Sequence, residues 1–103
     1  MNRLVFAVLL AGGAIASFHA RAQSADPNLG RNLGAACANC HGTGGHATTG
    51  MPALAGLPKE YIAKQMRDFR SGARPATIMH QISKGYTEAE TAAMAEYFSK
   101  LPR

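Results

Sequence analysis

Two cysteines stand close together in the chain, and a histidine directly follows the second: Cys37-Ala38-Asn39-Cys40-His41. On a helix this spacing puts the two thiols about one turn apart, where each can add to a vinyl group of a porphyrin. The imidazole is then carried beneath the iron, where its Nε2 atom can serve as a ligand. The pattern predicts one covalently bound haem c, attached through Cys37 and Cys40 and ligated by His41.

Three other kinds of site use cysteines at this spacing. A thioredoxin-like redox pair requires a preceding strand in a βαβ unit, and no stretch of the sequence alternates as a strand does. A zinc site would combine Cys37 and Cys40 with two of His41, His46 and His80, but no second Cys or His pair has zinc-finger spacing. A structural disulfide would close a small, strained ring. These three alternatives stay open beside the haem site.

Haem iron that only carries electrons needs a second protein ligand on the opposite face of the ring, and methionine is a common one. Met66 and Met94 fall on the apolar faces of helical patterns, where filling the core is their expected role. Met51 lies ten residues after His41, in a loop that should cover the same side of the haem. Met79 lies 38 residues after His41, far enough to reach the other side, and it is the predicted sixth ligand.

Two histidines compete with Met79 for this position. His80 is its neighbour and would give a bis-histidine site, but neighbouring helical residues point about 100° apart, so both cannot face the iron. His46 is tethered too close to His41 to cross the ring, and we expect it to be a solvated loop residue. The sequence therefore favours Met79 and leaves His80 as its rival.

The segments around these residues have helical rather than strand character. Asp26-Pro27 predicts the start of a helix that carries Leu29, Leu33 and Ala36 on one face and runs directly into the cysteine motif. A glycine-rich loop follows, from Gly42 to about Gly56. We therefore expect the motif at the end of a helix, just before a long loop.

Three further helices are predicted, and the fold class is all-α. They run from about Pro58 to Ser71, from about Ala76 to Lys84, and onward from a capping box at Thr87. The first of these has one side formed by Tyr61, Ile62, Gln65, Met66 and Phe69, which are apolar except for Gln65. A basic stripe comprises Lys64, Arg67, Arg70 and the following Arg74, of which we expect Lys64 and Arg67 to be solvated. The last helix is expected to bury Ala89, Ala93, Met94, Tyr97 and Phe98.

The N-terminal residues have the pattern of a secretory signal peptide, predicted to cover residues 1–22. Arg3 precedes an apolar stretch from Leu4 to Ala16, and a small-residue cleavage site ends at Ala22. Residues 23–103 then form a single domain, expected in the periplasm. An uncleaved anchor is the alternative, but no apolar run reaches the ~18–20 residues of a membrane span, so we expect no stable membrane insertion after cleavage.

The charge of the chain gives little support for binding to nucleic acid. The full sequence of 103 residues has a net charge of +5. Removal of the predicted signal peptide takes away Arg3 and Arg21 and leaves nine basic against six acidic residues, a net charge of +3. This modest charge, together with export from the cytoplasm, argues against a nucleic-acid partner.

Several segments resemble the class I cytochromes c: CANCHG, MPALAG, YIAKQMRDFRSG and AEYF, which together span essentially the whole region after residue 22. The resemblance implies an all-helical fold of three to four helices in which the first and last cross. It implies that Gly30 is a small contact residue packed against Tyr97. It also implies that the carbonyl of Pro52 accepts a hydrogen bond from Nδ1 of His41 and fixes the tautomer of the ring.

The stretch from Arg74 to Tyr86 is similar to a narrower group, the haem subunits of flavocytochrome c sulfide dehydrogenases. Because the motif occurs once, this would be a mono-haem version, an electron-transfer protein with no catalytic residues of its own. The resemblance implies a flavoprotein subunit or other redox protein as partner and Arg74 as a contact of a haem propionate. A free carrier between respiratory complexes and an open-site haem sensor or peroxidase are the alternative functions.

Overall fold

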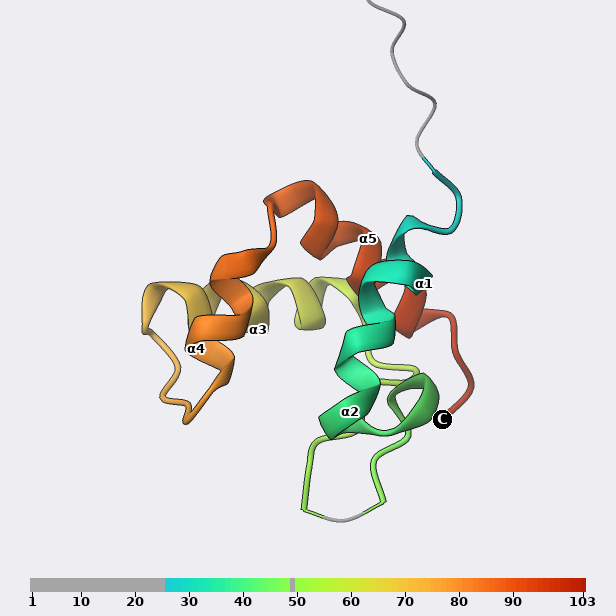
Figure 1. The fold of residues 1–103 in the computed structure, drawn as a ribbon, viewed down its shortest axis with the longest axis horizontal. Helices are drawn as coiled ribbons and strands as arrows, with labels where there is room; N and C mark the ends of the chain where they lie inside the picture. Colours follow the sequence, from blue (N-terminus) through green and yellow to red (C-terminus); the bar gives the residue numbers. More distant parts are fainter. Residues whose placement is uncertain (1–25, 49) are drawn as a thin grey trace, which may run out of the picture.

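The computed structural model describes residues 26–48 and 50–103, and this part of the chain is helical without any strand (Figure 1). The predicted signal peptide, residues 1–22, lies outside the described residues. Helices α1 (Leu29–Gly34), α2 (Ala38–His41), α3 (Lys59–Ser71), α4 (Met79–Ile82) and α5 (Glu88–Ser99) are joined by short 3₁₀ turns and loops. The all-α prediction is confirmed. None of the helices described is both long enough and apolar enough to cross a bilayer.

The cysteine motif lies at the end of a nearly continuous helical run. Helix α1 continues through the 3₁₀ turn η1 (Ala35–Cys37) into α2, which ends at His41. Gly42 then turns the chain with a φ of 81°, a conformation that favours glycine. The start of the run lies slightly later than predicted, because Asp26 forms a turn: its carboxylate accepts from the Asn28 N–H at 2.9 Å. The structure thus puts both cysteines and His41 on one helical segment, as the sequence predicts.

Helix α1 crosses α5 at two glycines (Figure 1). Gly30 and Gly34 are buried, and a Cβ built on Gly30 would lie 2.2 Å from the carbonyl oxygen of Ala93 and 3.0 Å from Cβ of Tyr97. The expected contact between Gly30 and Tyr97 is therefore confirmed. Glycine is required here because any side chain would hold the two backbones apart.

The large apolar residues of the first helix are not its buried residues. Leu29 and Leu33 are only half-buried, and Ala36 is exposed along the wall of a cavity. The closest contacts of this helix are made by Gly30 and Gly34, which have no side chain to show in a hydrophobic pattern.

Helix α3 has the bounds that the sequence predicts. It begins after Pro58 and ends at Gly72, which adopts the left-handed conformation with a φ of 82° and closes the helix. Ile62 of α3 is buried against α5, where it meets Ala95 and Phe98. Partly buried residues extend this small core: Cys37, Leu54, Leu57, Ala63, Tyr97 and Leu101.

Helix α4 begins at Met79, not near Ala76 as predicted, because the first helical hydrogen bonds are accepted by the carbonyl of Ile78, from the Gln81 and Ile82 N–H groups at 2.9 and 3.1 Å. The 3₁₀ turn η3 (Ser83–Gly85) then ends the segment at Gly85, as expected. Helix α4 packs against α3, with which it forms one side of the molecule (Figure 1). The segment that carries the predicted sixth ligand is therefore short and positioned mainly by its neighbours.

Helix α5 begins with the predicted capping box. The Thr87 hydroxyl accepts from the Glu90 N–H at 3.1 Å, and the Glu90 carboxylate accepts from the Thr87 N–H at 2.8 Å. Of the residues expected to face inward, Met94 and Phe98 are buried, Ala93 and Tyr97 are half-buried, and Ala89 is exposed. Thr91 and Ala95, which the prediction omitted, are buried. The buried face is therefore rotated toward α3 relative to the prediction.

Candidate functional site

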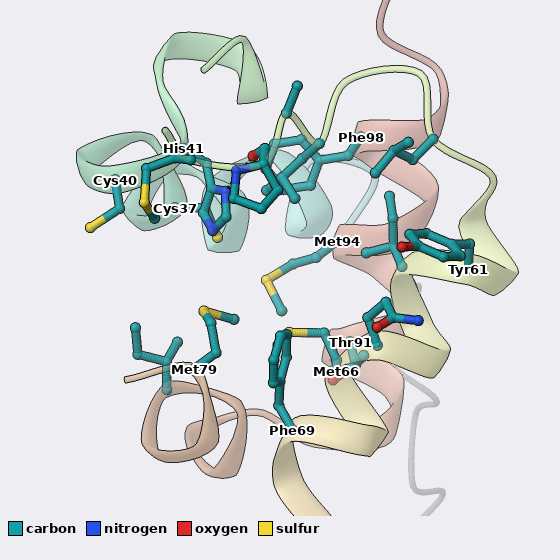
Figure 2. A pocket seen from close by; sticks show the side chains of 18 of the residues that line it. Cys37, Cys40, His41, Tyr61, Met66, Phe69, Met79, Thr91, Met94 and Phe98 are labelled. Atoms are coloured by element: carbon teal, nitrogen blue, oxygen red, sulfur yellow. Dashed lines mark hydrogen bonds between the residues drawn. The ribbon is translucent and has the colours of Figure 1, made fainter. Parts of the chain in front are cut away.

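A cavity of about 700 Å³ opens between α2, α3, α4 and α5, and its walls are mostly apolar (Figure 2). This volume lies within the range of sites for organic cofactors. The lining includes every residue that the sequence analysis assigned to a site: Cys37, Cys40, His41, Pro52, Arg74 and Met79. Residues from four separate segments thus converge on one cavity, although the roles assigned to them stay predictions.

His41 is 9% exposed and held in a defined orientation. Its Nδ1 atom lies 2.7 Å from the carbonyl oxygen of Pro52. A carbonyl can only accept, so Nδ1 carries the proton and donates it, which leaves the lone pair of the neutral ring on Nε2. The loop is itself held in place, because the Leu54 N–H donates to the Gly45 carbonyl at 2.8 Å. The ring therefore has the tautomer and support that a metal-ligating histidine requires.

Met79 lies across the cavity from His41, and its side chain extends toward the histidine ring (Figure 2). Its rival His80 is not among the residues that line the cavity. His46 is also directed elsewhere, since its Nε2 lies 2.7 Å from the carbonyl oxygen of Pro102 and its Nδ1 lies 3.3 Å from that of Thr43. His46 is exposed, as expected, but it links two parts of the chain instead of being merely solvated. Of these three residues, only Met79 lines the cavity, and its role as a ligand stays a prediction.

Three other methionines contribute to the walls of the same cavity. Met94 of α5 is 3% exposed, and Met66 of α3 is half-buried. Met51, in the loop after His41, is 41% exposed at the surface. The positions of Met66 and Met94 agree with the apolar packing role expected for them, in which polarizable side chains fill an irregular space.

The cysteines lack the environment of a thiol redox pair. Their thiols are not joined, Cys37 is half-buried, and Cys40 is exposed. Burial raises the pKa of the Cys37 thiol, with a smaller contribution from the charge of Cys40, and a backbone hydrogen bond opposes the shift. Catalytic cysteines of thioredoxin-like proteins have lowered pKa values instead. Within residues 26–48 and 50–103, no three His, Cys, Asp or Glu side chains gather to hold a metal ion, so the zinc alternative gains no support there.

One part of the cavity wall is positively charged. The guanidinium of Arg74 donates to the side-chain oxygen of Gln65 and lies 4.8 Å from the ring centroid of Phe69. All three residues line the cavity. An arginine held in this way presents its charge at a fixed place, where a carboxylate can pair with it. The sequence analysis named Arg74 but not the glutamine and aromatic ring that position it.

The basic stripe of α3 does not have a single environment. Lys64 is exposed and pairs with Asp68 at 2.5 Å, and Arg67 is exposed, as expected for a solvated face. Arg70 departs from this pattern, because its guanidinium is half-buried and bonds to residues of η3 and α5. Helical periodicity alone could not separate Arg70 from its neighbours, because the partners that define its role are 13 or more residues away.

The donor set and the shape of the cavity fit haem c. Two thiols lie on one side, a nitrogen and a thioether face each other across an apolar space, and a cation stands at the wall to pair with a propionate. This fit depends on the chemistry of the residues and not on similarity to any other protein.

Comparisons with known proteins agree with this fit. The family model described as Cytochrome c matches residues 28–102. The chain is 40% identical over 74 residues to the "Cytochrome subunit of sulfide dehydrogenase" of Chlorobaculum tepidum, covering 72% of this chain and 67% of that protein. It is 45% identical over 69 residues to the "Thiosulfate dehydrogenase electron acceptor" of Thiomonas intermedia, covering 65% and 32%.

A third relative is the "Cytochrome c4" of Pseudomonas aeruginosa, 32% identical over 100 residues, with 96% of this chain and 48% of that protein covered. The chain therefore spans about two thirds of the first of these relatives, about a third of the second and about half of the third.

Proposed function

Because the chain belongs to the cytochrome c family, whose domain carries a covalently bound haem c, we propose that it is a single-haem electron-transfer protein with His41 and Met79 as iron ligands. The observation that supports this most strongly is the placement of Nε2 of His41 and the side chain of Met79 on facing walls of one apolar cavity. The bound haem supplies a one-electron iron couple.

The residues of the cavity would have separate roles toward that group. Cys37 and Cys40 would hold it covalently, and Pro52 would keep Nε2 of His41 directed at the metal. Met79 would occupy the remaining position and so keep small ligands out. The apolar walls would exclude water, which raises the reduction potential by disfavouring the higher charge on the metal. Arg74 would pair with a propionate and reduce the cost of burying it.

The ligand pair can be tested on the holoprotein by optical spectroscopy. Methionine bound to ferric haem iron gives a weak far-red charge-transfer band, and it slows the binding of cyanide and carbon monoxide. We expect the wild-type band to be lost in Met79→Ala, with fast ligand binding, and to be kept in the control Met66→Leu. The variant His80→Ala should also keep the band. A wild-type protein without the band that binds cyanide rapidly would support the open-site sensor or peroxidase instead.

The proposal includes export and processing. Residues 1–22 would be a signal peptide and residues 23–103 the cytochrome domain of a periplasmic protein. Mass spectrometry of the secreted product tests this directly, because the expected mass is that of residues 23–103 plus one haem. A product that retains residues 1–22 in a membrane fraction would refute the cleavage, and a mass without haem would refute the attachment.

The donor of electrons is proposed from the relatives. One of them is named as a subunit of sulfide dehydrogenase and another as an electron acceptor of thiosulfate dehydrogenase. We propose that this chain accepts electrons from a dehydrogenase of reduced sulfur compounds, with a flavoprotein subunit as the first candidate partner. Copurification from the native organism with a larger flavin-containing polypeptide would support this partner. Reduction by other periplasmic carriers without such a complex would indicate a free carrier.

A further inference from the structure

The segment that carries Met79 is too short to hold its own shape. Helix α4 has four residues and the following turn η3 has three, well below the length at which a helix is stable alone. The five residues before Met79 have no regular structure. The position of the Met79 side chain must therefore depend on what fixes this segment to α3 and α5.

Arg70 of α3 makes the polar contacts that fix it. The Arg70 Nε atom donates to the carbonyl of Ser83 at 3.3 Å, and Nη2 donates to the carbonyl of Tyr86 at 3.0 Å. The same Nη2 donates to the hydroxyl of Thr91 at 3.2 Å, and Nη1 pairs with the carboxylate of Glu88 at 2.5 Å. One side chain thus joins α3 to both ends of the segment's C-terminal turn and to the first turns of α5.

A continuous set of hydrogen bonds connects this guanidinium to Met79 itself. Arg70 donates to the carbonyl of Ser83, and the Ser83 N–H donates to the carbonyl of Met79. Ser83 is fully buried, and Arg70 is not among the residues that line the cavity. Any effect of Arg70 on the site is therefore transmitted through its partners, Ser83 and Tyr86 of the segment and Thr91 of α5, and not by contact with the bound group.

The contacts require arginine and are costly to lose. Ser83 and Thr91 are 0% and 1% exposed, so water cannot easily replace the donor that their oxygens would lose. Buried acceptors without a donor destabilise the local structure more than the same groups at the surface. A lysine has a single nitrogen on a flexible chain, so it cannot reach the four acceptors with the geometry of the planar fork.

We propose that Arg70 is a positioning residue that fixes the segment from Met79 to Tyr86 against α3 and α5 and so keeps the Met79 sulfur facing His41. This inference rests on the proposed function, because it assumes that Met79 is the sixth ligand. Release of the segment would expose the metal position in a fraction of molecules, and the rate of binding of an external ligand would rise with that fraction.

The test uses the haem-loaded protein and compares variants of α3. We expect Arg70→Gln to bind cyanide at least about tenfold faster than wild type and to have a weaker far-red methionine band. Arg70→Lys should resemble Arg70→Gln in both the binding rate and the band. Arg67→Gln is the matched control, since it removes the same charge from an exposed position of the same helix. It should leave both the band and the rate unchanged.

A second control separates positioning from general loss of stability. Gly30→Ala loosens the contact of α1 with α5 at Ala93 and Tyr97, neither of which lines the cavity, and should lower the unfolding midpoint without faster cyanide binding. Glu88→Ala removes one of the four partners at an exposed site and keeps the inference testable if the Arg70 variants do not assemble. It should speed cyanide binding about two- to threefold, and an unchanged rate would contradict the inference.

Failure of this inference differs from failure of the proposed function. If wild type shows the band and both Arg70 variants bind cyanide at the wild-type rate, the positioning role is wrong while Met79 ligation stands. The same conclusion follows if Gly30→Ala speeds binding as much as Arg70→Gln does. If wild type itself lacks the band, the proposed ligation is wrong, and the premise of the inference is lost with it.

Discussion

Replacement of Gly30 by alanine tests the contact between α1 and α5 with the smallest possible change. The new Cβ would lie 2.2 Å from the Ala93 carbonyl oxygen, and this neighbour is backbone that no rotamer change can move. Ordinary contacts of a carbon atom lie near ~3.5 Å, so the two helices must separate by about 1 Å. Overpacking of this kind costs up to about 3 kcal/mol, and the better helix propensity of alanine returns about 1 kcal/mol. We therefore expect a net loss of about 2 kcal/mol.

Thermal unfolding of the haem-loaded protein measures this effect. For a domain of this size, 2 kcal/mol corresponds to a fall in Tm of about 8–16 °C. Gly85→Ala is the matched control, because a Cβ there meets nothing within 4 Å. The fall in Tm of Gly34→Ala should lie between those of Gly30→Ala and Gly85→Ala. The nearest neighbours of its new Cβ are ring atoms of Phe98 at 3.1 Å, which have some freedom to shift. A Gly30→Ala protein that melts within about 2 °C of wild type would refute the reasoning.

Three further substitutions test other parts of the structure. Thr87→Ala removes the hydroxyl of the capping box and should lower the free energy of unfolding, measured with urea, by about 1 kcal/mol. Thr87→Ser keeps the hydroxyl and should leave that free energy nearly unchanged. His46→Ala removes the contact with the carbonyl of Pro102. It should lower the free energy of unfolding by about 1 kcal/mol and speed hydrogen exchange of the Leu101 amide. Unchanged exchange would show that this contact does not hold the C-terminal residues in place. Burial raises the pKa of Tyr86, and the charge of Glu90 adds to this shift. The stability that the protonated form of Tyr86 contributes is therefore present below about pH 10 and is lost as the pH rises through the folded value. Tyr86→Phe should therefore lose less stability than wild type between about pH 9 and pH 11, and equal losses would contradict this assignment.

Local sequence signals located the helices well wherever the signal is carried by the residues at their ends. Gly72 closes α3 and the box at Thr87 opens α5, both as predicted, because caps act within a few residues. Helix faces were less predictable. The contact of α1 depends on Gly30 and Gly34, and glycine does not contribute to a hydrophobic pattern. Thr91 is buried in α5 because Arg70 supplies a partner for its hydroxyl, which a scale of hydrophobicity cannot anticipate.

The candidate site was predictable in its residue types but not in its supports. A fixed spacing defines the cysteine motif, distance along the chain separates Met79 from Met51, and helical periodicity separates it from Met66 and Met94. The tertiary fold decides the rest. Gln65 holds Arg74 from nine residues away, and the acceptors of Arg70 lie 13 to 21 residues away. Candidate ligands could therefore be named from their chemistry, while the residues that position them required the structure.

The cavity and the core of this domain are parts of the same apolar interior. The buried hydrophobic residues of the described chain form a small set: Ala55, Ile62, Met94, Ala95 and Phe98. Three of these, Ile62, Met94 and Phe98, also line the cavity. A domain of this size buries little surface by itself and commonly depends on a cofactor or cross-link for stability. A haem in the cavity would extend the core from α5 to the Met79 segment, so the same group would supply the redox couple and much of the apolar contact between the helices. This accounts for the short length of α4. Arg70 of α3 would fix the Met79 segment on one side and the haem would cover it on the other, so the segment needs no core of its own.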